Sequence, residues 1–182
     1  MTIFVFENIE ESHQRKLFTV LGVDYVLASR TWLNLPLMAI VGIVIALIFA
    51  PVEQLSSRIL VGIGYGILIV ISSFCHGLGH IISSHLVNAP MKSLISTATV
   101  NVSHYDDDEV HPSRIHVGRS PGGPILNLLI GLLAIAAYTF ALPNHFLLFL
   151  GIVNLLFVAL TLSPIPSLDG AVILRELRNW KK

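Results

Sequence analysis

Four long apolar segments constrain this sequence more than any other feature. They are residues 33–50, 59–87, 122–142 and 145–163. Each is close to or above the roughly 20 residues that a helix needs to cross a bilayer. Hydrophobic residues make up 54% of the chain and charged residues only 12%, which is unlike a soluble globular domain. The sequence therefore predicts an all-α membrane protein with about four transmembrane helices.

The basic residues predict how the chain is oriented in the bilayer. With four crossings, both ends and the loop between the second and third spans share one side, and this side holds every Lys and Arg except Arg58. Cytoplasmic loops carry an excess of Lys and Arg. We therefore expect both termini and the loop 88–121 to lie in the cytoplasm.

We divide the chain into an N-terminal cytoplasmic segment, residues 1–32, and one transmembrane domain, residues 33–180. Within this domain, the loop 88–121 is a sizeable polar insertion. Its first part, KSLISTATVNVSHY, is rich in β-branched residues and predicts one or two strands. The later HPSRIHVGRSPGGP has the Pro and Gly content of an irregular loop. We therefore expect a small β-containing cytoplasmic insertion between helices two and three.

The charge balance excludes one class of partner. The formal net charge is zero, and the basic residues do not cluster with aromatic ones as nucleic-acid binders require. The expected partner is the lipid bilayer, and nucleic acid is excluded.

The stretch ISSFCHGLGHIISSH, residues 71–85, carries two histidines four positions apart. Positions i and i+4 share one helix face, so His76 and His80 can reach the same metal ion. Ionisable side chains at membrane depth are costly and usually mark a site. The pair therefore predicts a metal site within the second span.

A third ligand is expected at the same depth. His76 lies about 17 residues into the second span, roughly 25 Å at 1.5 Å per residue, and hence near the cytoplasmic face. The fourth span runs in the same direction, and Asp169 follows its cytoplasmic end. Two histidines and one carboxylate, with a fourth position open, are a zinc set of the catalytic type.

Three motifs in order resemble the site-2 protease family of intramembrane zinc metalloproteases. HGLGH at 76–80 is similar to the family's HExxH motif, and GGPILN at 122–127 resembles its GPxxN element. NLLFVALTLSPIPSLDG at 154–170 is similar to its N…PxPxLDG element. The resemblance spans residues 59–175, most of the chain.

This resemblance implies roles for particular residues. It implies that His76, His80 and Asp169 bind zinc and that Asn127 lies near the active site. It also implies that Gly123 and Pro124 form a turn there that contacts substrate. The implied activity is that of a zinc metalloendopeptidase whose cytoplasm-facing site cuts the transmembrane part of single-span substrate proteins.

The sequence departs from the family pattern at three positions. Gly77 stands where the family has its general acid/base glutamate, Thr161 replaces an asparagine, and Ala171 replaces a glycine. Positioned acid–base catalysis is commonly worth about 10²- to 10⁴-fold in rate. We therefore expect a weak or inactive relative that binds and holds transmembrane helices rather than cutting them.

Two other functions remain open on the sequence. A working intramembrane protease would need a carboxylate from Asp106–Glu109, or a natural glutamate that has been replaced at Gly77. The other open function is that of a non-proteolytic membrane protein that binds or transports metal ions. Transporters usually place ionisable ligands along a path through the bilayer, whereas the first and third spans carry no charged residue.

Three loop histidines could also bind metal among themselves or cap the site: His104, His111 and His116.

Overall fold

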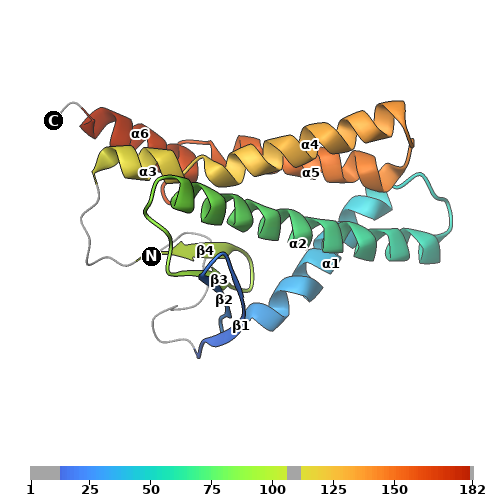
Figure 1. Cartoon of the computed structure of the whole chain (residues 1–182). Helices are drawn as coiled ribbons and strands as arrows, with labels where there is room; N and C mark the ends of the chain where they lie inside the picture. Colours follow the sequence, from blue (N-terminus) through green and yellow to red (C-terminus); the bar gives the residue numbers. More distant parts are fainter. Residues whose placement is uncertain (1–12, 106–111, 181–182) are drawn as a thin grey trace.

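The structure, a computed structural model, describes residues 13–105 and 112–180. The helices are η1 (Thr31–Leu33), α1 (Asn34–Phe49), α2 (Leu55–Leu86), α3 (Ser113–Arg119), α4 (Gly122–Phe140), α5 (His145–Thr161) and α6 (Asp169–Asn179). The strands are β1 (Arg15–Val20), β2 (Val23–Leu27), β3 (Ser93–Ser96) and β4 (Asn101–His104). The long helices α2, α4 and α5 run side by side, α1 crosses obliquely beside α2, and a small sheet lies along the second half of α2 (Figure 1).

The four segments predicted to cross a membrane are all helical and form α1, α2, α4 and α5. Within the described residues, three helical stretches are long and apolar enough to cross a bilayer: Thr31–Phe49, Leu55–Leu86 and Ser113–Phe140. The apolar α5 has 17 residues, at the lower limit for a crossing. These helices indicate a membrane protein, and the number of crossings stays a prediction.

Helix α2 is the centre of the fold. Its 32 residues correspond to about 48 Å at 1.5 Å per residue, more than the roughly 30 Å of a hydrocarbon core. Its second half carries the serines and histidines of the sequence ISSFCHGLGHIISSH. The helices α1, α4 and α5 all pack on it, and α1 contacts its first half at Gly62 and Gly66.

The sheet shows that the all-α expectation was incomplete. Its four strands are arranged in the order β1-β2-β3-β4, so the predicted insertion supplies only half of it. Strands β1 and β2 come from the segment before α1, and β2 pairs in parallel with β3, with Asp24 opposite Ser93. The sequence analysis did not predict strands in that segment. The sheet therefore joins the chain before the first helix to the chain after the second.

A tight turn forms the β1–β2 hairpin. Both residues between the strands have positive φ angles, 50° at Leu21 and 81° at Gly22. Two positive φ values are what the type I′ hairpin turn requires. Glycine adopts this backbone easily, whereas leucine does so at a cost. The hairpin thus depends on pairing and packing of its strands to hold Leu21 in place.

One loop prediction was wrong. The segment HPSRIHVGRSPGGP contains the helix α3 and the start of α4 rather than an irregular loop. Pro112 directly precedes α3 and Pro121 directly precedes α4, so neither lies in a helix interior, where proline breaks a helix. The prolines here begin helices. His111 and the acidic run Asp106–Glu109 lie outside the described residues.

An apolar cluster fixes the sheet to α2. Val23 of β2, Leu94 of β3, Met91 and Ile81 of α2 pack together and are each at most 3% exposed. All four residues of β3 are buried, because β3 has a strand on each side and α2 above it. This packing brings the edge strand β4 beside the polar half of α2.

Candidate metal centre

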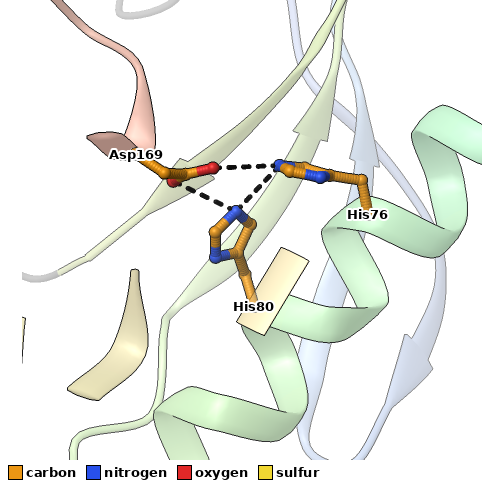
Figure 2. Close-up of side chains that lie close together, drawn as sticks. All are labelled: His76, His80 and Asp169. Atoms are coloured by element: carbon orange, nitrogen blue, oxygen red, sulfur yellow. Dashed lines mark hydrogen bonds and ion pairs between the residues drawn. The ribbon is translucent and has the colours of Figure 1, made fainter. Parts of the chain in front are cut away.

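Three side chains converge where α2 meets the start of α6. Figure 2 shows the imidazoles of His76 and His80 facing the carboxylate of Asp169. The two Nε2 atoms are 3.0 Å apart. Asp169 Oδ2 lies 3.3 Å from His76 Nε2, and Oδ1 lies 3.3 Å from His80 Nε2. The structure thus brings together the three residues that the sequence analysis named as ligands.

These distances suit one tetrahedral metal ion. Two ligand atoms that are each about 2.0–2.1 Å from a zinc ion are about 3.3 Å apart at a tetrahedral angle. Both nitrogen-to-oxygen distances in the trio match this value, and the nitrogen-to-nitrogen distance is slightly shorter. The trio could therefore hold a metal ion with little rearrangement.

The hydrogen bonds behind the imidazoles point to the same conclusion. His80 Nδ1 lies 3.2 Å from the carbonyl oxygen of Arg119, and His76 Nδ1 lies 2.8 Å from Asn127 Oδ1. Both oxygens are acceptors, so each Nδ1 donates its hydrogen and each neutral ring turns an Nε2 lone pair toward the centre. Two Nε2 lone pairs and a carboxylate in contact repel one another, so a cation, either a proton or a metal ion, has to lie between them.

Asp169 is held in place by the packing of the residue that follows it. The residue after it, Gly170, packs directly against the carbonyl of Leu162 at the end of α5, where a Cβ would collide. Burial acts to raise the pKa of the Asp169 carboxyl, but hydrogen bonds and charge from His76 and His80, when the imidazoles carry a proton toward it, outweigh burial and lower the pKa to about 2. Asp169 is therefore ionised across the neutral range when a cation lies between it and the imidazoles.

A cavity of about 510 Å³ opens beside the trio. Its walls come from the second half of α2, the strand β4, the helix α3, the end of α5 and the start of α6. Asp169 is the single carboxylate among the described residues that line it. Thr161, which stands where the family resemblance would place asparagine, also lines it and donates its hydroxyl to the Phe157 carbonyl.

Three further polar side chains line the cavity opposite α2. The guanidinium of Arg119 lies 3.7 Å from the centre of the Tyr105 ring, and its Nη2 lies 2.8 Å from His116 Nδ1. Burial raises the pKa of Tyr105 to about 12, so its hydroxyl stays protonated. Of the three loop histidines, His116 is thus beside the site, whereas His104 is in β4 and exposed.

Gly77 has a structural reason that the sequence alone did not reveal. It is buried in α2, and a Cβ added to it would lie 2.5 Å from Cδ2 of Leu94. Leu94 is fully buried. A side chain at position 77 would therefore start toward space that β3 already fills, and glycine fits this packing.

The first turn of α4 lies directly against the ligands. A Cβ added to Gly123 would be 2.6 Å from Nε2 of both His76 and His80. Pro124 follows it and is buried. Asn127, one turn further, makes the 2.8 Å contact with His76. The residues expected near the active site are therefore placed around the trio, whereas their contact with substrate stays a prediction.

Two further buried polar side chains near His76 were given no role from the sequence, although one of them, Asn154, begins the segment similar to N…PxPxLDG. Asn154 of α5 and Ser72 of α2 are almost fully buried and hydrogen-bonded to Asn127 or to one another. A carboxamide in the middle of an apolar segment is the signal that could have drawn attention to Asn154, because polar groups at that depth require partners.

Comparison with solved structures shows the same arrangement of elements elsewhere. The chain is similar to "Site-2 Protease from Methanocaldococcus jannaschii" with a TM-score of 0.60, over 93% of this chain and 73% of that chain, at 21% identity. This chain has a site-2 protease fold. The sequence matches no protein-family model, and no curated protein matches it significantly. The site-2 protease fold is thus evident from the arrangement of the helices and sheet.

Proposed function

We propose that this protein is a zinc-binding intramembrane scaffold of the site-2 protease type whose proteolytic activity is weak or absent. The observation that carries the proposal is the acceptor-only cluster of His76, His80 and Asp169 beside a cavity. When bound there, zinc would supply Lewis acidity to a water molecule and to a peptide carbonyl group. The residues around it then decide whether hydrolysis can follow.

Peptide hydrolysis also needs a group that takes a proton from water and delivers it to the leaving amine. Gly77 offers no such group, and Asp169 is the single carboxylate among the described residues lining the cavity. Tyr105 stays protonated because its pKa is raised to about 12. The described cavity therefore supports metal binding better than it supports efficient cleavage.

The expected clients are single-span membrane proteins, which would lie in the bilayer beside the cavity. Many of the hydrophobic side chains of α1 and α4 are exposed in this chain, as expected for helices that face lipid or another helix. On this proposal the protein binds transmembrane segments and holds them. The orientation that places the site on the cytoplasmic side follows from the distribution of basic residues.

The test pairs zinc content with cleavage. Elemental analysis of the purified protein should give one zinc per chain, and His76→Ala or Asp169→Ala should abolish it. A transmembrane substrate should survive incubation with the parent protein and be cut by a Gly77→Glu, Leu94→Ala double variant, in which the smaller residue makes room for the glutamate. The matched control is Leu94→Ala alone, which should not cut.

Two results would count against the proposal. A parent protein without zinc would refute the metal site. Zinc-dependent cleavage by the parent at the rate of the double variant would show that another group supplies the proton transfer, and Asp106–Glu109 would then be the first residues to replace.

A further inference from the structure

A second group of polar side chains lies behind the metal ligands, among the apolar helices. Ser72 of α2, Asn127 of α4 and Asn154 of α5 are each at most 1% exposed. A carboxamide buried in apolar surroundings is costly unless its hydrogen bonds are made. Each of these side chains has such partners, and the partners fix which way each carboxamide points.

The orientation of Asn154 is set by a backbone group. Its Nδ2 lies 2.8 Å from the carbonyl oxygen of Leu150 and 2.9 Å from Ser72 Oγ. The carbonyl can only accept, so the nitrogen of the carboxamide must face it. The Ser72 hydroxyl donates to the carbonyl of Leu68 and is free to accept from Asn154. The Asn154 oxygen consequently faces Asn127.

Asn127 is oriented in turn. Its Nδ2 donates to Asn154 Oδ1 at 2.6 Å and to the Ser72 carbonyl at 3.2 Å, and both of these atoms are acceptors. Its Oδ1 is left facing His76 Nδ1 at 2.8 Å. The imidazole must therefore carry its hydrogen on Nδ1, and its Nε2 is left with a lone pair directed at Asp169 and His80.

We propose that Asn154 is a positioning residue that acts through Asn127 to hold His76 in the tautomer that can bind metal. Asn154 does not line the cavity, and its side-chain hydrogen bonds go to Asn127, Ser72 and Leu150. When the Asn154 oxygen is missing, the Asn127 carboxamide can rotate and present Nδ2 to His76 Nδ1. This favours a hydrogen on His76 Nε2 and removes the Nε2 lone pair. The inference builds on the proposed function only in treating Nε2 as a ligand, because the tautomer exists with or without metal.

The experiment compares the parent with Asn154→Leu and Asn127→Leu. In metal-free protein at alkaline pH, histidine-labelled nitrogen NMR should show His76 of the parent with its hydrogen on Nδ1, and a mixture of tautomers in Asn154→Leu. Zinc affinity should fall about 10- to 100-fold, with the smaller loss expected because Asn127 keeps its bond to the Ser72 carbonyl. In the Asn127→Leu background, Asn154→Leu should cause no further loss, since its effect passes through Asn127.

The control separates positioning from loosened packing. Gly151 lies one turn before Asn154 on α5, and a Cβ there would be 2.6 Å from Ile135 Cδ1 on α4. Gly151→Ala should therefore lower thermal stability and leave the His76 tautomer and zinc affinity unchanged. An unchanged tautomer in Asn154→Leu, or the same change in Gly151→Ala, would overturn the inference. A parent with the Nδ1 hydrogen in place but no affinity for zinc would instead refute the proposed function.

Discussion

At position 77, packing and catalysis make opposite demands on the side chain. On the proposed function, peptide cleavage would need a carboxylate there, whereas the fully buried Leu94 fills the space next to Gly77. Inserting atoms into a packed core typically costs about 1–3 kcal/mol. Leu94 of β3 thus occupies the space that a side chain at position 77 would need.

This conflict predicts a coupling between the two positions. Gly77→Glu should lower the free energy of unfolding by about 1–3 kcal/mol, and Leu94→Ala by about 2–5 kcal/mol because it leaves a cavity. The double variant should lose less than the sum, since the glutamate occupies the space that alanine opens. Thermal or denaturant unfolding in detergent measures all three differences. Strictly additive losses would show that position 77 and Leu94 do not compete for the same space.

The sequence was sufficient to predict that His76, His80 and Asp169 lie together but not what surrounds them, and metal binding by these residues stays a prediction. Two features of single helices were enough to predict their proximity: His76 and His80 are four residues apart on one helix, and Asp169 follows the last span. The contacts of Leu94 with Gly77, and of Asn154 with Asn127, depend on the depth and rotation of separate helices and strands. Such contacts cannot be read from hydropathy or spacing.

At the scale of whole elements, the start of α4 controls how closely two helices approach. Gly79 of α2 packs against the backbone of Gly122, and Gly123 lies against both imidazoles. A methyl group on Gly123 would occupy space within 2.6 Å of both Nε2 atoms. Gly122 and Gly123 therefore let α4 begin directly beside His76 and His80.

Gly123→Ala should weaken zinc binding at least about tenfold, the scale at which disturbed surroundings affect metal sites. Gly131→Ala, two turns further along α4, is the matched control because its added Cβ would meet Leu155 of α5 at 3.0 Å, away from the ligands. The control should lower the unfolding temperature with zinc affinity retained. Competition with a chelator measures the affinity, and equal affinities for both variants would contradict the role given to Gly123.

The four long helices were predictable from the sequence to within a few residues, whereas the sheet was predicted only in part. Long apolar runs signal a helix locally. Strands of four to six residues, such as β1 and β3, carry a weak local signal, and the partner of β2 lies beyond two intervening helices. Proline content misled the prediction at α3, because Pro112 directly precedes that helix and does not lie in its interior, where proline breaks a helix.

At the scale of the molecule, the sheet constrains the path of the chain across a membrane. Because β2 and β3 pair side by side, the chain must leave the membrane face on which the sheet lies through α1 and return to the same face through α2. Figure 1 shows the α1–α2 and α4–α5 connections at the end of the helices opposite the sheet, α3 and α6. This arrangement agrees with the orientation expected from the basic residues, which stays a prediction.

Single cysteines placed in a Cys75→Ser background should reveal the orientation. Gln54 and Pro143 are exposed residues in the two connections, and Asn179 is exposed near the end of α6. In intact cells, a membrane-impermeant thiol reagent should label Gln54→Cys and Pro143→Cys but reach Asn179→Cys only after the membrane is opened. Labelling of Asn179→Cys and Gln54→Cys from the same side would refute the four-crossing arrangement.

The parallel pairing of β2 with β3 also sets an order of events during synthesis. A ribosome adds about 5–20 residues per second, so the β1–β2 hairpin emerges several seconds before the strand it pairs with. An isolated two-stranded hairpin is at best marginally stable, and this one has to wait until α1 and α2 have been made and inserted. Only then can β3 close the sheet and β4 take its place beside the histidines. We therefore expect membrane insertion of the first two helices to precede assembly of the candidate metal centre, which also has to await the synthesis of Asp169.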